Sequence, residues 1–356
     1  MILINSIDVS LFRSLSFIGN PFCPPETIYL LHYITCYNID MNKIAVIIPC
    51  YNEATTINKV VKDFKKHLPT AKIYVFDNNS TDHTAEVAQK AGAIVIHESK
   101  QGKGNVVRSA FHNIDAECYL LVDGDDTYSA KFAPQLCTDV LENNIDMVIG
   151  DRLSSSYFTE NKRKFHGFGN ILVRKLINLI YHSDIRDVMT GYRALSYRFV
   201  KTFPIITKGF EIETEMTIHA LDKNLNIKNE IIDFKDRPEN SVSKLNTISD
   251  GTRVIKTIIN FYKNYKPFHF FSLLTLLFII IGTIFLIPVL VEFGSTGLVP
   301  KLPTFLASIF FYLCATQSFF GGLILQNTTE KSRQQFEFFL SQAEYQLKQL
   351  KKHEKK

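Results

Sequence analysis

Three aspartates within four residues are the strongest chemical signal in this sequence. Asp123, Asp125 and Asp126 follow an apolar strand pattern, Cys118–Val122. Carboxylates this close repel one another, so a cation or strong hydrogen-bond donors must compensate them. Hard oxygen ligands suit Mg²⁺ or Mn²⁺, which typically take one or two carboxylates together with substrate phosphates. The cluster therefore predicts a divalent cation site, and the missing downstream Glu argues against an EF-hand.

Polar motifs also follow two earlier strand patterns. Pro49-Cys-Tyr-Asn-Glu53 follows the first, where a Rossmann dinucleotide site would carry G-x-G-x-x-G, and this chain does not. Asp77–Asp82 follows the second. An Asx-turn and a helix cap explain Thr81 and Asp82 there, but they explain Asp77 less well.

A lysine flanked by glycines opens a helical pattern at Gly102–Asn105. Backbone N–H groups at a helix N-terminus, together with Lys103, suit a diphosphate. The Walker pattern G-x-x-x-x-G-K-[ST] is absent, so the motif suits a diphosphate without being a P-loop.

Apolar, β-rich runs alternate with helical patterns and must position these motifs. The runs cover 43–49, 72–77, 93–97, 118–123 and 146–150. Continuous apolar strands that alternate with helices predict an α/β fold with a mostly parallel sheet covered on both faces. Ligands bind such sheets at the carboxyl ends of the strands, which is where the polar motifs fall.

Composition excludes several classes of protein. The chain has 356 residues, of which 46% are hydrophobic and 21% charged, too apolar for a disordered protein and too charged for one built mainly of spanning helices. A formal net charge of +5 does not favour a nucleic-acid binder. The six cysteines form no C-x-x-C pair, which argues against disulfide frameworks and zinc sites and favours a reduced, cytosol-facing protein.

Two stretches, 267–291 and 303–326, are long and apolar enough to cross a membrane as helices. The loop between them carries only Glu292 and Lys301 as charges, whereas basic residues crowd the far ends of both stretches. The positive-inside rule places the large domain and the C-terminal tail in the cytoplasm, on an inner or cytoplasmic membrane crossed twice.

Amphipathic patterns flank these spans. The basic patterns at 167–185 and 252–266 predict helices that either cover the core or lie at a membrane surface. The tail at 330–350 repeats apolar residues at a spacing that suits an amphipathic or self-associating helix, with a solvated helix end as the alternative.

The first forty residues fit the rest of the chain poorly. They lack the pattern of a secretory signal, and Met41 directly precedes the first strong strand, so 1–40 is interpreted as lying upstream of the natural start or as a variable extension. The expected segments are 1–40, 41–250 as the cytoplasmic domain, 251–266 as a basic juxtamembrane helix, 267–291, 303–326, and 327–356 as a basic helical tail.

Together these motifs resemble glycosyltransferase family 2, which has the inverting GT-A nucleotide-sugar-binding (Rossmann-like) fold. Within that family the chain is similar to polyprenyl-phosphate hexosyltransferases, namely dolichol-phosphate mannose synthases and bacterial undecaprenyl-phosphate glucosyltransferases. The resemblance covers about 43–330. It rests on IPCYNE (48–53), DNNSTD (77–82), GKG (102–104), VDGDDTY (122–128), GDR (150–152), DVMTGYR (187–193), GFEIETE (209–215) and DRPENSVSKL (236–245).

The resemblance implies roles for individual residues. Those expected around the donor nucleotide sugar are Pro49, Tyr51, Glu53, Asp77, Lys103, Asp123 and Arg237. Those expected in catalysis are Asp125 as principal metal ligand, Lys244 on the donor diphosphate, and Arg152 and Arg163 on the acceptor phosphate. Mannose synthases often carry DADxQ, whereas this chain has Thr127 at the last position. The second metal ligand is therefore open between Asp126 and Thr127, with Asp123 also among the metal candidates.

Structural alternatives stand beside these roles. Arg152, Arg163 and Arg193 could be ordinary surface residues, and that reading is preferred for Arg174 and Arg186. Glu211, Glu213 and Glu215 are expected on a strand or wide loop, where one of them could be functional.

The resemblance implies transfer of a hexose, glucose or an N-acetylhexosamine, from a UDP-linked donor to undecaprenyl or a similar polyprenyl phosphate. A phosphate acceptor is already ionised near pH 7 and needs no strong general base; for a hydroxyl acceptor, Asp125, Glu211 or Glu213 would be the candidates. A homo-oligomer and a flippase partner are compatible with this activity.

Three alternatives are open. A mannose synthase would use GDP-mannose, and an inactive membrane scaffold would bind nucleotide sugar without transfer. A processive polysaccharide synthase would carry an acceptor motif with tryptophan, and this chain contains no tryptophan.

Overall fold

The computed structural model describes residues 41–154, 166–209, 211–235 and 262–354. Four predictions fall on other parts of the chain: the N-terminal segment 1–40, Arg163, and the pair Arg237 and Lys244. Most of the predicted juxtamembrane helix, 251–261, also lies outside the described residues.

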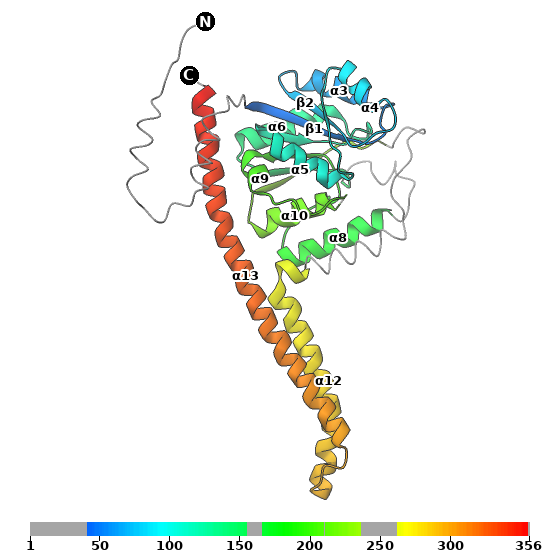
Figure 1. Ribbon diagram of the computed structural model, residues 1–356, viewed down its shortest axis with the longest axis vertical. Helices are drawn as coiled ribbons and strands as arrows, with labels where there is room; N and C mark the ends of the chain where they lie inside the picture. The colour runs from blue at the N-terminus through cyan, green and yellow to red at the C-terminus, as the bar shows by residue number, and fades with distance from the viewer. Residues whose placement is uncertain (1–40, 155–165, 210, 236–261, 355–356) are drawn as a thin grey trace, which may run out of the picture. The chain divides into compact units, whose positions relative to one another are not determined.

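A seven-stranded sheet organises the domain, in the order β3-β2-β1-β4-β6-β5-β7 (Figure 1). Its strands are β1 (Asn42–Cys50), β2 (Lys72–Asp77), β3 (Ile94–His97), β4 (Ala116–Leu121), β5 (Met147–Asp151), β6 (Arg193–Ser196) and β7 (Ile227–Ile231). Only β6 runs antiparallel to its neighbours, β4 and β5. The predicted α/β fold with a mostly parallel sheet is therefore confirmed; β6 and β7 are additions that the sequence patterns did not reveal.

Both faces of the sheet are covered by helices, which explains the continuous apolar strands. The helices of this part are α3 (Ile57–His67), α4 (Thr84–Lys90), α5 (Lys103–Asn113), the 3-10 turn η1 (Ala130–Phe132), α6 (Ala133–Glu142), α8 (His166–Tyr181), α9 (Tyr197–Thr202) and α10 (Ile212–Asp222). Ile47 of β1 packs with α5, α8, α9 and α10 on one face, while Val46 and Ile48 pack with α3, α4 and α6 on the other. Because neighbouring side chains point to opposite faces and both faces are covered, β1 is apolar from Ile44 to Cys50.

Two sequence expectations need correction in this half. The pattern at 167–185 forms a helix only as far as Tyr181, and its Val173 and Ile177 are buried in the core. Glu213 and Glu215 do not lie on a strand or loop, because helix α10 begins at Ile212; Glu211 directly precedes the helix. Acidic side chains in the first turn of a helix interact favourably with the helix dipole, so their clustering marked a helix N-terminus.

Two long helices follow, α12 (Pro267–Thr296) and α13 (Leu302–Glu354). In the described part of the chain, these two are long and apolar enough to span a membrane. They pack against each other as a hairpin, with the Phe285 and Phe311 rings stacked at 5.7 Å and Thr283 Oγ1 lying 2.9 Å from the Tyr312 hydroxyl. No break in α13 separates the predicted second span from the predicted tail.

Candidate functional site

The loops after β1 and β2 are tied together at the carboxyl edge of the sheet. The Asn52 backbone N–H donates to Ser80 Oγ at 3.0 Å, and Asn52 Oδ1 accepts from the Thr81 N–H at 2.8 Å. Asn52 has a φ of 55°, a left-handed conformation that Asn tolerates better than most residues. Asp82 accepts from the backbone of Ala54 and of Thr84, so it stabilises the loop and the start of α4 as expected.

Negative charge concentrates around the buried thiol of Cys50. Burial raises the pKa of Cys50, and the carboxylates of Glu53, Asp77, Asp123 and Asp125 raise it further. These carboxylates come from the ends of β1, β2 and β4, which are adjacent in the sheet. We call residues 49–53, 77–82 and 123–127 the donor edge.

Asp77 is buried with one oxygen unsatisfied. It is 5% exposed, and its Oδ2 lies 3.2 Å from His97 Nδ1. Its Oδ1 is also buried and has no hydrogen-bond partner among the described residues. An orphaned buried acceptor is costly, and a ligand donor can compensate for it. Nearby on the donor edge, Tyr51 is 36% exposed and Glu53 is 8% exposed.

The three predicted metal ligands have different surroundings. Asp125 is buried, and its Oδ1 accepts from the Thr127 hydroxyl at 2.6 Å and from the Thr127 N–H at 3.2 Å. Asp126, with a φ of 61°, points to Lys59, whose Nζ lies 2.5 Å from its Oδ1. No three His, Cys, Asp or Glu side chains of the described residues gather as a ready-made metal cage.

Lys103 is buried between two carboxylates. Its Nζ lies 2.5 Å from Asp123 Oδ1 and 2.6 Å from Glu213 Oε1. Burial lowers the pKa of Lys103, but the two carboxylates outweigh burial and the net shift is upward. Burial raises the pKa of Glu213, and the attraction of Lys103 opposes this only in part. The fold thus joins Lys103, predicted on the donor side, to a glutamate from a distant helix.

The glycines beside Lys103 have a packing reason. A Cβ on Gly104 would lie 2.3 Å from the Thr207 carbonyl oxygen, and the Gly104 N–H donates to the Lys208 carbonyl at 3.0 Å. Gly102 has a φ of 126°, which side chains rarely adopt. The first turn of α5 therefore packs against the chain at 207–208.

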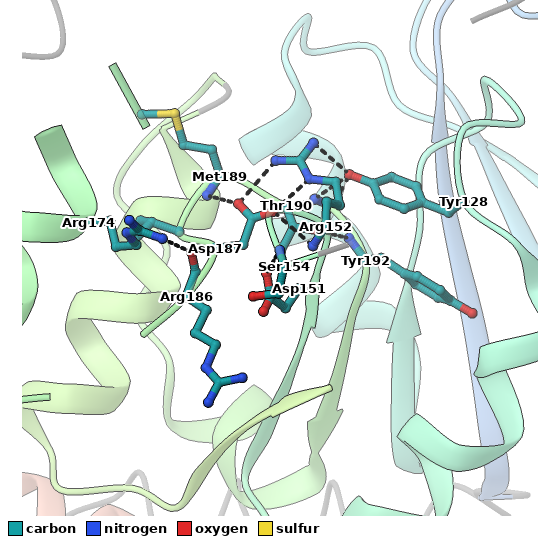
Figure 2. A network of polar contacts seen from close by, with 12 residues as sticks. Tyr128, Asp151, Arg152, Ser154, Arg174, Arg186, Asp187, Met189, Thr190 and Tyr192 are labelled. Carbon is teal, nitrogen blue, oxygen red and sulfur yellow. Dashed lines mark hydrogen bonds and ion pairs between the residues drawn. The ribbon is translucent and has the colours of Figure 1, made fainter. Parts of the chain in front are cut away.

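Arg152 is held by Asp187, a partner that sequence reasoning did not identify. Figure 2 shows the network, in which Arg152 Nε and Nη2 donate to the two oxygens of Asp187 at 2.7 and 3.1 Å. Its Nη1 lies 3.3 Å from the Tyr128 hydroxyl, which also accepts from the Gly191 N–H at 3.0 Å. We call Tyr128, Arg152, Asp187 and Gly191 the Asp187 network. Asp187 and Tyr128 both belong to the sequence motifs given above, but their contacts with Arg152 are evident only in the fold.

Burial strengthens the contacts of this network. Asp187 is fully buried and the Arg152 side chain is 12% exposed. Burial raises the pKa of Tyr128 to about 12, although Arg152 acts in the opposite direction. The alternative that Arg152 is an ordinary surface residue is therefore wrong.

Arg193 is also buried, so the surface alternative is wrong for it too. It donates to the carbonyls of Val188 and Thr190 at 2.6 and 3.0 Å and so closes the loop that begins at Asp187. Burial lowers the pKa of Arg193 to about 10. Of the other arginines, Arg186 is exposed and Arg174 is half-buried.

Comparison with known proteins agrees with this architecture. The family described as Glycosyl transferase family 2 matches residues 45–203. Among solved structures, glucosyl-3-phosphoglycerate synthase from Mycobacterium tuberculosis in complex with phosphoglyceric acid aligns with a TM-score of 0.52 at 19% identity. The alignment covers 62% of this chain and 80% of that one, and it shows that the two share a fold.

Relatives in sequence extend the match. Protein RfbJ of Shigella flexneri is 60% identical over 109 residues, which are 31% of this chain and 84% of RfbJ. A dolichyl-phosphate hexose transferase of Haloferax volcanii is 27% identical, over 64% of this chain and 96% of its own length. The glycosyltransferase AglJ of the same organism is 33% identical over 230 residues, which are 64% of this chain and 75% of AglJ. The chain therefore belongs to glycosyltransferase family 2 and is a glycosyltransferase.

Proposed function

We propose that this enzyme transfers a hexose from a nucleotide sugar, with a UDP-sugar as the expected donor, to a polyprenyl phosphate at the cytoplasmic membrane face. The observation that carries the proposal is the acidic donor edge in a chain that also has two helices apolar enough to span a membrane. The first feature suits a nucleotide diphosphate with its cation, and the second suits a lipid acceptor.

The donor edge supports nucleotide binding. Asp77 Oδ1 needs a hydrogen-bond donor, and the N–H of a base or a ribose hydroxyl supplies one. Tyr51 offers an exposed ring beside it, on which a base can stack. We assign Pro49, Tyr51, Glu53 and Asp77 to the base and ribose.

The residues of the donor edge fit a divalent cation, Mg²⁺ or Mn²⁺. We assign Asp125 and Asp123 to it, because one or two carboxylates plus the donor's phosphate oxygens complete such a site. Asp126 is the third candidate, and its side chain points to Lys59 of α3. A bound cation would neutralise the charge that develops on the departing nucleotide diphosphate. Solved structures of the mycobacterial synthase contain Mn²⁺ together with UDP, which supports a divalent cation here.

The proposed lipid-phosphate acceptor is supported by the chemistry of a phosphate and by the relatives in sequence. A lipid phosphate is a competent nucleophile at neutral pH, so the chain must orient it rather than deprotonate it. Arg152, oriented by Asp187, and Arg163 are assigned to the acceptor phosphate. The phosphate attacks the anomeric carbon in line, the bond to the nucleotide diphosphate breaks, and the configuration inverts. The dolichyl-phosphate hexose transferase supports this acceptor class.

The orientation in the membrane follows from the distribution of basic residues. At the end of the hairpin where α12 meets α13, Glu292 of α12 and Lys301 of the connecting loop pair at 2.9 Å. The other end of α13 carries Lys331, Arg333, Lys348, Lys351 and Lys352. The positive-inside rule then places the catalytic domain in the cytoplasm.

The test is transfer by the full chain in detergent. A panel of UDP-glucose, UDP-N-acetylglucosamine and GDP-mannose is offered with undecaprenyl phosphate and either Mg²⁺ or Mn²⁺, and the products are released nucleotide and glycosylated lipid. We expect one UDP-sugar to give both products, with loss of activity on chelation. Nucleotide-sugar binding without lipid-dependent release would overturn the proposal in favour of a scaffold, and exclusive use of GDP-mannose would overturn the choice of donor.

A further inference from the structure

Helix α13 belongs to two environments. Residues 302–329 contain no charged side chain, whereas residues 331–352 are rich in lysine, arginine and glutamate. The helix has 53 residues without a break, which makes it about 80 Å long. Neither proline nor glycine follows Gly322 in this helix, so nothing in its sequence favours a hinge there. We call residues 331–352 the docking segment.

The docking segment is attached to α10 by an ion pair and a ring contact. Arg333 Nε lies 3.1 Å from Asp222 Oδ1, and the Asp222 side chain is 1% exposed. One turn further on, Phe336 is 5% exposed, and its ring centroid lies 5.4 Å from that of His219. A buried carboxylate with a guanidinium partner is costly to separate, so this contact is more than a surface encounter.

Further contacts continue along the same face of the helix. Ala343 joins the buried core of the domain, and Glu344 Oε1 accepts from Arg198 Nη1 at 2.9 Å. Lys351 then pairs with Glu117 of β4. From Arg333 to Lys351 the contacts extend over about 27 Å of helix. Attachment over such a length fixes an orientation, whereas a single contact would only tether the domain.

The opposite face of the docking segment makes no comparable contact among the described residues. Phe338 lies on that face, because two residues of an α-helix turn it by about 200° from the buried Phe336, and it is 77% exposed. Phe339 lies at the flank of the contact face and is 60% exposed. The amphipathic pattern of the tail therefore serves contact with this chain's own catalytic domain through one face.

Helix α10 links the docking segment to the site. Its C-terminal end provides His219 and Asp222 to α13, and its first turn provides Glu213 to Lys103, which in turn contacts Asp123 on the donor edge. The helix is 11 residues long and almost entirely buried, so the docking segment rests on a rigidly packed element of the catalytic domain.

We propose that the docking segment holds the catalytic domain at a fixed height and orientation relative to the apolar half of α13, so that the phosphate of a membrane-embedded acceptor reaches the donor edge. This inference rests on the proposed lipid acceptor. Arg333 and Phe336 act as positioning residues, because they touch neither substrate. Their effect is to raise the effective concentration of a lipid phosphate at the site.

The test uses a matched pair of substitutions in the full chain in proteoliposomes. Phe336→Asp places a charge in the buried contact, whereas Phe338→Asp makes the same change on the exposed face. We expect Phe336→Asp to lower transfer to undecaprenyl phosphate in the bilayer at least about tenfold. In the same variant, the rate of transfer to a short-chain, water-soluble polyprenyl phosphate and the affinity for UDP should both stay within about twofold of the wild-type values. Phe338→Asp should change none of these quantities. An equal loss with both acceptors, or no loss with either, would overturn the inference.

A second measurement does not depend on transfer. A fluorophore at Asn113→Cys on the exposed end of α5 reports energy transfer to dyes on lipid head-groups. We expect Phe336→Asp to broaden this distance distribution and Phe338→Asp to leave it narrow; an unchanged distribution in Phe336→Asp would sink the inference even if no acceptor were used. If Phe336→Asp does not fold, Arg333→Ala with Lys331→Ala as its control gives the same comparison. A wild-type chain that binds UDP but uses neither acceptor contradicts the proposed function instead.

Discussion

The donor edge and the Asp187 network lie on the same sheet, but their polar side chains are satisfied differently. On the donor edge, four carboxylates surround one buried thiol, and Asp77 keeps an oxygen without a hydrogen-bond partner among the described residues. In the Asp187 network, the guanidinium of Arg152 is matched to both oxygens of Asp187. The first region thus leaves one buried acceptor without a donor, whereas in the second the guanidinium and the carboxylate compensate each other.

We propose that the first region is built to take up a ligand, whereas the second is built to hold a side chain in one orientation. A buried acceptor without a donor, such as Asp77 Oδ1, costs free energy, and that cost is retained where a ligand compensates it. Charge that is fully paired within the protein fixes a loop. Both kinds of residue occur in the sequence motifs, so a motif alone does not distinguish them.

The largest expected effect is on the donor edge. Asp125→Asn should lower transfer at least about 100-fold, because it removes a charge assigned to the cation, while the fold is retained. The matched change Asp126→Asn should cost much less, since Asp126 is paired with Lys59. Steady-state transfer rates at saturating Mn²⁺ check this pair. Equal losses would show that the two aspartates are not distinguished by their surroundings.

Next, removal of one partner should destabilise the Asp187 network. Asp187→Ala leaves Arg152 buried without its carboxylate and should lower the free energy of unfolding by about 3 kcal/mol. Denaturant unfolding in detergent measures this loss. In the double variant with Arg152→Ala, the total should be clearly less than the sum of the two single losses. Additive losses would break the comparison, because Arg152 would then not depend on Asp187.

His219 is a third case for this comparison. Its Nε2 is buried and has no hydrogen-bond partner among the described residues, but aromatic rings rather than a ligand site enclose it. Burial lowers the pKa of His219 to about 4. The unfolded chain takes up its proton near pH 6.5, before the folded chain does. Stability is therefore complete above pH 6.5 and falls by about 3 kcal/mol as pH decreases to 4.

The change His219→Phe should remove that part of the acid sensitivity, because the new ring fits among Phe199, Phe203 and Phe336 and does not titrate. The free energy of unfolding, measured for both proteins at pH 7 and at pH 4.5, tests this prediction. The same pH dependence in the variant would assign the acid sensitivity to other groups.

The smallest expected effect again concerns the donor edge. Asp77→Asn should weaken UDP binding about tenfold, because the orphaned oxygen is assigned to the nucleotide. The free energy of unfolding should change by less than about 0.5 kcal/mol, since that oxygen has no partner to lose. Calorimetric titration with UDP and thermal unfolding separate the two quantities. A large loss of stability would place Asp77 with the structural residues instead.

Local pattern was enough to predict the strands that carry the donor edge. The runs that became β1, β2 and β4 are apolar at nearly every position, and burial on both faces allows little else. By contrast, β6 is a four-residue strand that begins with the buried Arg193, and its sequence shows no apolar pattern that would predict a strand. The sequence predicts a strand or loop where helix α10 begins, because this helix is buried on nearly all sides and shows no amphipathic period.

By itself, the sequence determined the fold class, the family, and the acidic residues at the ends of adjacent strands, because these depend on neighbours along the chain. The tertiary structure decided which charges are compensated. Lys103 meets Glu213, Arg152 meets Asp187, and Arg333 meets Asp222 across separations of 110, 35 and 111 residues in the chain. Such pairs are chosen by the packing of distant helices and loops, and no local spacing encodes them. The same packing shows that one face of the C-terminal helix contacts the catalytic domain of its own chain, which the sequence pattern alone left open.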